Sequence, residues 1–241
     1  MIARGLLAAS VLFFSAVASA DAPRVAIIID DMGYHLANGR RAIDLPGPVS
    51  FSFLPGAPRA RALAERAHAQ GKDILLHLPL QAANDDAAPG LSEIHIDMSR
   101  ERVGYTFTEA MESVPYVIGV NSHRGSLLTR HPGHMQWLME EIGARESLFF
   151  IDSYTHHESV ALQIALENGV AALRRDVFLD PDPSPEAVQR EFERLKTLAR
   201  QRGHALAIGH PYPVTLELLE RELPRLAEEG FELVRVSELL P

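Results

Sequence analysis

The hydrophobic positions of this chain follow two alternating spacings along most of its length. Short apolar runs of strand length recur, and between them apolar residues return every three or four positions, as on one face of a helix. The predicted strands cover residues 25–29, 49–54, 74–80, 117–120, 148–151, 171–178, 205–208 and 231–236. The predicted helices include residues 59–69, 100–113, 135–142, 159–167, 185–202 and 214–229. Such alternation is typical of α/β domains with a parallel sheet.

Local signals support several of the predicted helix ends. Ser184 precedes a proline that would occupy the first helical position, and Thr155 with Glu158 has the spacing of a capping box. Glycines follow the helical runs, as expected where left-handed backbone ends a helix. They are Gly71, Gly143, Gly169, Gly203 and Gly230. Because no linker composition or repeat interrupts the pattern, we expect one domain over residues 22–241.

Eight strand-like runs separated by helices predict an α/β fold of a particular kind, an irregular (β/α) barrel. An open, doubly wound sheet is the alternative. In both architectures, binding and catalytic side chains gather at the carboxyl ends of the strands and on the loops that follow them. The residues that end each apolar run are therefore the first candidates for a binding or catalytic role.

The first twenty residues have a different pattern. They carry one charge, Arg4, followed by the apolar run 6–17 and the small residues Ala18-Ser19-Ala20. This predicts a signal peptide over residues 1–20 and an exported, periplasmic protein. An uncleaved membrane anchor is the alternative, but the apolar run is shorter than the ~20 residues that a spanning helix needs. We therefore expect no stable membrane insertion after cleavage.

Charge and cysteine content narrow the classes of partner. Without residues 1–20 the chain has 22 Lys and Arg against 32 Asp and Glu, a net charge of −10. An acidic domain repels nucleic-acid phosphates, so no nucleic-acid partner is expected. The chain has no cysteine, which excludes disulfides and thiolate metal sites.

Ionisable and amide side chains end several of the predicted strands. They are Asp30-Asp31, His77, Asn121, His123, Asp152, Arg175-Asp176 and His210. Carboxylate oxygens and imidazole nitrogens are the usual ligands of a catalytic divalent ion, with one position left open for water. The pattern predicts a divalent metal at this rim, and zinc is the expected ion.

Each candidate also has a structural interpretation. Asp152 has the position of a helix N-cap, and His77 lies in an apolar stretch where a buried core histidine is common. Asp30 and Asp31 are adjacent carboxylates, which repel each other unless positive charge lies nearby. The remaining histidines fall in predicted helices or surface loops and are expected to be solvated or capping. These are His35, His68, His95, His131, His134, His156, His157 and His204.

A set of motifs in the mature chain resembles those of the divergent polysaccharide deacetylases of bacteria. They occur in the family's order and span nearly all of the mature sequence. They read Ile-Ile-Ile-Asp30-Asp31-Met-Gly33, Leu-His77-Leu-Pro79-Leu-Gln81, Gly119-Val-Asn121-Ser-His123-Arg-Gly125-Ser126, Phe150-Ile-Asp152-Ser153, Arg175-Asp176-Val-Phe-Leu-Asp180 and Ile-Gly209-His210-Pro211. The resemblance implies a distorted barrel of the carbohydrate-esterase type, a metal ion, and deacetylation of N- or O-acetylated envelope sugars.

The resemblance also implies roles for individual residues. Asp31 corresponds to the metal-binding aspartate and Asp30 to the catalytic base, while His210 resembles the histidine that acts as general acid. His77 fits the first of two metal-binding histidines, but Gln81 stands where the second would be. We expect His123 to replace that missing ligand.

Further polar residues of the motifs are expected to orient the histidines or to contact substrate. These are Gln81, Asn121, Ser126, Asp152, Arg175 and Asp176.

Three functions fit this sequence. The favoured one is a metal-dependent hydrolase that removes acetyl groups from an envelope polysaccharide or a peptidoglycan-related glycan. The second is a catalytically silent periplasmic protein that binds a glycan or a cell-wall hydrolase partner, which the glutamine at position 81 favours. The third is a hydrolase of small molecules, since fold and metal do not fix the substrate. Aromatic residues that stack on sugars are few, and Tyr34, Tyr154 and Tyr212 follow strand ends.

Overall fold

The computed structural model describes residues 22–84 and 92–240, so the predicted signal peptide lies outside the described residues. Within these residues nine parallel strands form one sheet in the order β6-β5-β4-β3-β2-β1-β8-β7, and β9 pairs with β1. Their bounds are β1 Arg24–Met32, β2 Ser50–Phe53, β3 Ile74–Leu80, β4 Gly119–Arg124, β5 Phe149–Asp152, β6 Ala172–Arg174, β7 Val177–Phe178, β8 His204–Gly209 and β9 Glu232–Leu233.

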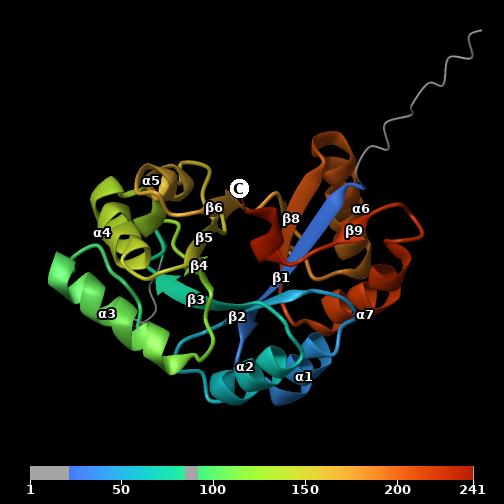
Figure 1. Cartoon of the computed structure of the whole chain (residues 1–241), viewed down its shortest axis with the longest axis horizontal. Coiled ribbons are helices and arrows are strands. Elements are labelled where there is room, and N and C mark those ends of the chain that lie inside the picture. Colours follow the sequence, from blue (N-terminus) through green and yellow to red (C-terminus); the bar gives the residue numbers. More distant parts are fainter. Residues whose placement is uncertain (1–21, 85–91, 241) are drawn as a thin grey trace, which may run out of the picture.

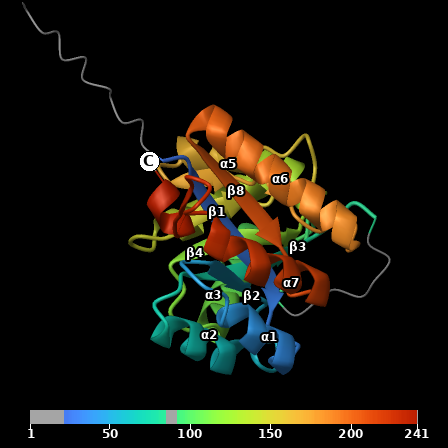
Figure 2. The ribbon, with the colours of Figure 1, turned by 90° about the vertical axis from the view of Figure 1, so that its right-hand side faces the viewer.

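Seven α-helices and three short 3-10 helices connect the strands within the described ranges. They are α1 Leu36–Ile43, α2 Ala60–Ala69, α3 Arg100–Ser113, η1 Leu128–Arg130, α4 Pro132–Gly143, α5 Ala161–Glu167, α6 Pro185–Arg202, α7 Pro213–Glu222, η2 Leu223–Arg225 and η3 Val236–Leu239. The sheet curls into a half-barrel with the α-helices on its outer side (Figure 1), and α6 packs on β8 and β1 (Figure 2). The predicted irregular (β/α) barrel is confirmed. None of the helices in the described ranges has both the length and the apolar character needed to cross a membrane.

The half-barrel has two hydrophobic cores. The larger one fills the space between the sheet and its helices, and the smaller one lies on the concave side of the sheet. Ile28, Leu75 and Ile208 from the strands belong to this smaller core together with Val236 and Leu239 of η3. Since β9 pairs with the first residues of β1, this C-terminal segment covers the end of the barrel where the strands begin. The other end, where the strands finish, remains for the site.

The segment predicted as one strand over 171–178 is instead two strands at opposite edges of the sheet. β6 ends one edge, β7 ends the other, and only two residues separate them. The backbone N–H of Arg175 donates to the Asp152 carbonyl at 3.0 Å, and that of Asp176 donates to the Leu206 carbonyl at 2.9 Å. We call this connection, Arg175-Asp176, the seam, because it joins two sheet edges that share no strand ladder.

Other elements differ from the predictions for identifiable reasons. The capping-box prediction at Thr155 is wrong, because α5 begins at Ala161 and the Thr155 hydroxyl donates instead to the Arg124 carbonyl. The last predicted strand shortens to β9, followed by η3. The helix predicted over 214–229 ends at Glu222, since Pro224 cannot continue its hydrogen bonding.

Two helix features fit the sequence signals, and one helix was not predicted. Ser184 is the N-cap of α6, and Gly203 ends that helix with a left-handed φ of 82°. Helix α1 contains Gly39, a poor helix former. A Cβ at position 39 would lie only 2.6 Å from the Leu63 side chain, so glycine permits the close packing of α1 on α2.

Candidate metal centre and proton donor

The predicted metal ligands come from three strands that are neighbours or near neighbours in the sheet. Asp31 lies in β1, His77 in β3 and His123 in β4. They meet because parallel strands finish at the same end of the sheet. The concave face also carries Ile28, two residues before Asp30, so the alternation of side chains along β1 directs Asp30 to the same interior.

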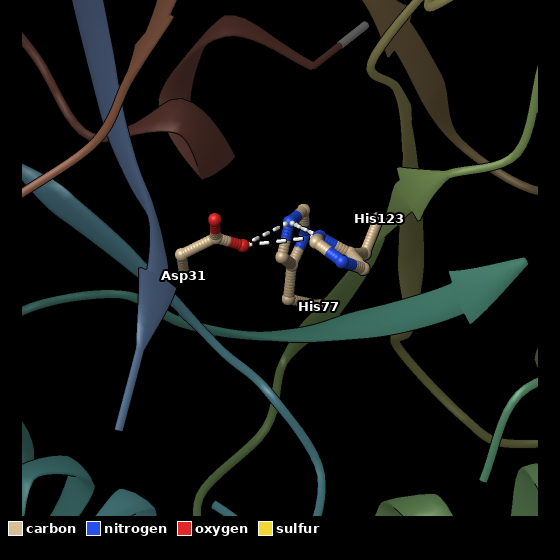
Figure 3. Close-up of side chains that lie close together, drawn as sticks. All are labelled: Asp31, His77 and His123. Carbon is tan, nitrogen blue, oxygen red and sulfur yellow. Dashed lines mark hydrogen bonds and ion pairs between the residues drawn. The ribbon is translucent and has the colours of Figure 1, made fainter. Parts of the chain in front are cut away.

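The three residues converge on one point, as Figure 3 shows. Asp31 Oδ1 lies 3.0 Å from His123 Nδ1 and 3.2 Å from His77 Nε2. The two imidazole nitrogens are 3.1 Å apart. Four ligands about 2.0 Å from a tetrahedral ion stand ~3.3 Å from one another, so these spacings suit an ion of zinc size. The structure therefore brings together the three residues predicted as ligands.

The donor set also fits a cation chemically. Among the described residues, Asp31 Oδ1 is a buried oxygen that receives no well-directed hydrogen bond, although two imidazole nitrogens lie close. Asp31 has a left-handed φ of 55°, a conformation that aspartate tolerates better than most residues. This carboxylate oxygen and the two imidazole nitrogens beside it offer the three ligand atoms of a catalytic zinc site.

Electrostatics around the ligands separate the two adjacent aspartates. Burial favours the neutral form of Asp31, but the nearby His123 and His77 outweigh it and lower its pKa well below the usual range. Burial opposes the charge of His77 as well, yet Asp30 and Asp31 raise the pKa of His77 to about 9. Burial raises the pKa of Asp30, against the opposing effects of His77 and His210. The two carboxylates thus differ in proton affinity, as in sites where they have different roles.

Asp30 is held by an amide at the centre of the barrel. Asn121 Nδ2 donates to both oxygens of Asp30, at 2.9 and 3.0 Å, and Asn121 Oδ1 lies 2.8 Å from His77 Nδ1. The Ser52 hydroxyl of β2 also donates to Asn121 Oδ1. All four side chains are buried. Asn121 therefore contacts both a predicted metal ligand, His77, and the predicted base, Asp30.

The predicted proton donor lies across the site from the ligands. His210 follows β8, and its Nε2 is 3.7 Å from Asp31 Oδ2. Asp180 accepts from the His210 ring at Nδ1 (2.8 Å) and from the His210 backbone N–H (2.7 Å), and its Oδ2 also accepts from the Thr215 hydroxyl. Burial lowers the pKa of His210, but the Asp180 carboxylate outweighs burial and raises it. Tyr212 stacks on the ring with centroids 5.3 Å apart.

A cavity of about 190 Å³ opens between the ligands and His210. Its polar walls include Asp30, His77, His123 and Arg175, and Phe178 and Ile208 form an apolar side. The side chain of His123 is 26% exposed, so the cluster is accessible from this cavity. A cavity of this size can hold a small group of a larger ligand.

Four of the residues predicted to orient the histidines or to contact substrate have their described side-chain hydrogen bonds to other groups: Gln81, Ser126, Asp152 and Asp176. Gln81 accepts from the Ile96 backbone N–H through Oε1, and the Ser126 hydroxyl accepts from the Ala83 backbone N–H. Asp152 accepts from the Tyr154 backbone N–H and the Ser159 hydroxyl. These contacts position loops beside the site.

Asp176 belongs to the seam. Its carboxylate accepts from the Leu206 backbone N–H and from Arg202, both at 2.9 Å. Its side chain therefore completes the pairing with β8 that a longer strand would otherwise make. Arg175 lies at the cavity, but its guanidinium donates to the carbonyls of Ser153 and Tyr154.

Asp180 ends one of the motifs but has no predicted role, and Ser52 lies outside the motifs. Asp180 follows the apolar run Val-Phe-Leu, so the rule that found the other strand-end residues also applies to it. Ser52 lies inside a short apolar strand and has no distinguishing sequence signal. A further group, His156, His157 and Glu158, also brings potential ligand atoms together, but Glu158 is paired with Arg130 and the group is largely exposed.

Known proteins are similar to this chain in sequence and in fold. A family model described as divergent polysaccharide deacetylase matches residues 27–240. The uncharacterized protein YibQ of Escherichia coli K12 is 33% identical over 235 residues, which cover 96% of this chain and 73% of YibQ.

Solved structures share the fold at lower sequence identity. The uncharacterized protein ATU2773 from Agrobacterium tumefaciens superposes with a TM-score of 0.87 at 23% identity, covering 92% of this chain and 90% of that one. The catalytic domain of a peptidoglycan N-acetylglucosamine deacetylase from Eubacterium rectale gives a TM-score of 0.59 at 14% identity, with coverages of 92% and 96%. BA3943 from Bacillus anthracis, a CE4 family pseudoenzyme, gives 0.55 at 11% identity, with coverages of 90% and 65%. The shared fold thus includes both an enzyme and a pseudoenzyme.

Proposed function

Because the chain belongs to the divergent polysaccharide deacetylase family, we propose that it is a metal-dependent hydrolase that removes acetyl groups from an envelope polysaccharide or a peptidoglycan-related glycan. One observation carries the proposal. Asp31, His77 and His123 converge on a single point, with Asp30 and His210 beside them at the same cavity. This arrangement provides a cation site, a base and an acid within reach of one small substrate group.

Asp31, His77 and His123 would hold the ion, with zinc expected from the carboxylate and imidazole donors. When bound, such an ion supplies Lewis acidity that polarises an acetyl carbonyl and lowers the pKa of a water molecule. The chain's own contribution is to fix these donors. Asn121 holds the His77 ring from β4, and the β3–β4 pairing of His77 with Asn121 keeps both in register.

Asp30 and His210 would share the proton transfers. Asp30 would accept the proton of the attacking water, because its carboxylate is buried at the cavity and is held next to the ligands. His210 would donate a proton to the leaving amine or alkoxide, since Asp180 favours its protonated form. The two groups would thus act in opposite proton transfers, with Asp30 accepting a proton and His210 donating one.

The rest of the proposal concerns substrate and location. Tyr34 and Tyr212 are 57% and 42% exposed after the neighbouring strands β1 and β8, and Tyr212 already stacks on His210. Exposed aromatic rings near a cavity suit the apolar faces of sugars. Removal of the predicted signal peptide, residues 1–20, would place the protein in the periplasm, where acetylated envelope glycans are found. We propose that the protein does not bind nucleic acid, because its net charge of −10 without residues 1–20 repels phosphates.

The test combines metal analysis with acetate release. The protein is expressed with its own N-terminal segment, so that it can be exported and processed, and is then purified. Its metal content is measured, and acetate release is assayed on acetylated chitin oligomers and peptidoglycan fragments. We expect about one zinc per chain and acetate release that chelation abolishes and zinc restores. Asp30→Asn should retain the metal and lose the reaction. Bound metal with no acetate from any acetylated sugar would refute the deacetylase proposal and leave the metal site.

A silent binding protein is the second candidate, and Gln81 is the observation that favours it. Its side chain accepts from Ile96 N–H, so among the described residues position 81 adds no donor to the cluster of Asp31, His77 and His123, and the second metal-binding histidine that the family resemblance implies is missing there. Such a protein would bind glycan fragments or a cell-wall hydrolase without turnover. Tight binding of an acetylated glycan that is recovered intact after long incubation with zinc-loaded protein would support it.

A further inference from the structure

We infer that Asn121 is a positioning residue that gives the adjacent carboxylates Asp30 and Asp31 different roles. It holds Asp30 away from the metal and turns His77 so that Nε2 faces it. This inference rests on the proposed metal site. Its test uses the coordination of the ion, so it can fail or succeed independently of the deacetylase reaction.

Asn121 makes several hydrogen bonds in the barrel interior. It is fully buried in β4 and pairs in register with His77 of β3. Its amide nitrogen reaches across to Asp30 in β1, and its amide oxygen meets His77 Nδ1 and the Ser52 hydroxyl. One neutral side chain thus links its own strand, β4, to β1, β2 and β3.

The neighbours of Asn121 determine which way its amide points. The two oxygens of Asp30 lie 2.9 and 3.0 Å from Asn121 Nδ2. An ionised carboxylate accepts hydrogen bonds and cannot donate them, so the group facing Asp30 must be the NH₂ of the amide. Exchanging the amide nitrogen and oxygen would place Asn121 Oδ1 against those oxygens and leave the Ser52 hydroxyl facing an NH₂ group. The observed orientation satisfies all the groups together.

This orientation fixes the tautomer of His77. Asn121 Oδ1 is an acceptor, so the His77 Nδ1 at 2.8 Å must carry a hydrogen. In the neutral ring the lone pair is then on Nε2, the atom 3.2 Å from Asp31 Oδ1 and 3.1 Å from His123 Nδ1. A histidine that binds metal through one nitrogen commonly donates from the other to a fixed acceptor. Here that acceptor is an amide.

Asn121 also decides which aspartate is free to bind the ion. Asp30 Oδ2 is 3.5 Å from His77 Nε2, so Asp30 is close enough to compete with Asp31 as a ligand. Both Asp30 oxygens are engaged by the same Nδ2, whereas Asp31 Oδ1 receives no well-directed hydrogen bond. The amide therefore keeps Asp30 outside the ligand set and available for proton transfer.

The chemistry at position 121 is specific to an amide. An aspartate there would repel Asp30, and a serine or alanine is too short to reach Asp30 and His77 together. Loss of the amide removes both restraints, so we expect Asp30 to enter the ligand set and the His77 ring to lose its fixed orientation.

The experiment substitutes Co²⁺ for the native ion in the purified processed protein and records its visible absorption, which weakens as the number of ligands rises. The chains compared are wild type, Asn121→Ala, and the double variant Asn121→Ala with Asp30→Asn. Asn168→Ala is the matched control, since it removes a partly buried amide that bonds Gln136 far from the ligands.

We expect Asn121→Ala to reduce the Co²⁺ absorption and to change metal affinity by about 10- to 100-fold, the range for residues that support a ligand. The double variant should regain the wild-type spectrum, because an amide at position 30 is a poor ligand. Asn168→Ala should match wild type. A wild-type spectrum and affinity in folded Asn121→Ala would overturn the inference.

A second measurement needs no variant, in case Asn121→Ala does not fold. Nitrogen-15 NMR of the zinc-loaded wild type distinguishes a protonated Nδ1 from a protonated Nε2 in each histidine. We expect His77 to carry its hydrogen on Nδ1 and to bind zinc through Nε2. Binding through Nδ1 would contradict the inference, whether or not the protein releases acetate.

Discussion

His77, which is buried, and His210, which is half-buried, both line the cavity but differ in what faces their Nδ1 atoms. His77 meets the neutral amide of Asn121 at 2.8 Å, and His210 meets the carboxylate of Asp180 at the same distance. Both rings direct Nε2 towards Asp31, at 3.2 and 3.7 Å. Two rings with similar surroundings at one nitrogen thus have chemically different partners at the other.

The partner at Nδ1 suits each ring for a different task. An amide acceptor orients a ring without adding charge, so His77 can offer its Nε2 lone pair to a cation. A carboxylate acceptor stabilises the imidazolium, so His210 retains a proton that it can donate.

His77→Ala should abolish tight zinc binding, with a loss of affinity greater than about 100-fold, because it removes a ligand instead of a group that supports one. Acetate release should disappear with the metal. Competition with a chromophoric chelator measures the affinity. His204→Ala, which removes an exposed histidine at the start of β8, should bind zinc as wild type does. Unchanged zinc binding in His77→Ala would remove it from the ligand set.

His210→Asn should keep the zinc and lower the rate of acetate release by about 10²–10⁴-fold, the usual contribution of a general acid or base. The combination separates the two histidines, since one substitution removes the metal and the other removes only the reaction. Metal content and kcat are measured on the same preparation. Loss of zinc in His210→Asn would show that both histidines belong to the ligand set.

Zinc affinity should depend on pH through His77. The metal-free protein holds a proton on this ring up to a pKa of about 9, and zinc must displace it. Below that pKa, affinity should rise about tenfold for each unit of pH increase, because one proton is released on binding. Asp31 adds no such dependence near neutrality, since its pKa is lowered. Calorimetry in buffers of different protonation enthalpy counts the protons, and release of none would contradict the prediction.

Asp180→Asn should have the smallest effect, a shift in the pH profile. Asp180 raises the pKa of His210, so its removal lowers that pKa. A general acid works while protonated, and activity is lost as pH rises through its pKa. The alkaline limb of the profile should therefore move to lower pH, with zinc content unchanged. NMR titration of His210 checks the direction, and an unchanged limb would argue that another group donates the proton.

Much of the fold followed from the spacing of apolar residues. The limits of β3, α3 and α6 match the predicted ranges, because long, regular patterns leave little choice. The split of 171–178 into β6 and β7 did not follow, since an apolar run does not show that two residues within it cross between sheet edges. That information resides in contacts made with Asp152 and Leu206, far away in the sequence.

The site was predictable to a similar extent. Asp31, His77 and His123 each end or follow an apolar run, so a rule about strand ends places them at one rim. Hydrogen-bond partners were harder to predict, because geometry and not position in a motif decides them. Gln81 and Asp152 belong to the motifs but bind backbone groups of nearby loops. Ser52 belongs to none of the motifs and lies next to Asn121.

The seam gives the half-barrel two unlike joints. On one side, β8 is joined to β1 by a continuous ladder from Arg24–His204 to Ile29–Gly209. On the other, Arg175 and Asp176 provide single backbone hydrogen bonds, supplemented by the Asp176 carboxylate. Any opening motion of the half-barrel is therefore expected at the seam, where few backbone hydrogen bonds join the two sheet edges. Such a movement would change the distance between His210 and the predicted metal ligands. It would leave the Asp180–His210 and Asn121–His77 hydrogen bonds intact.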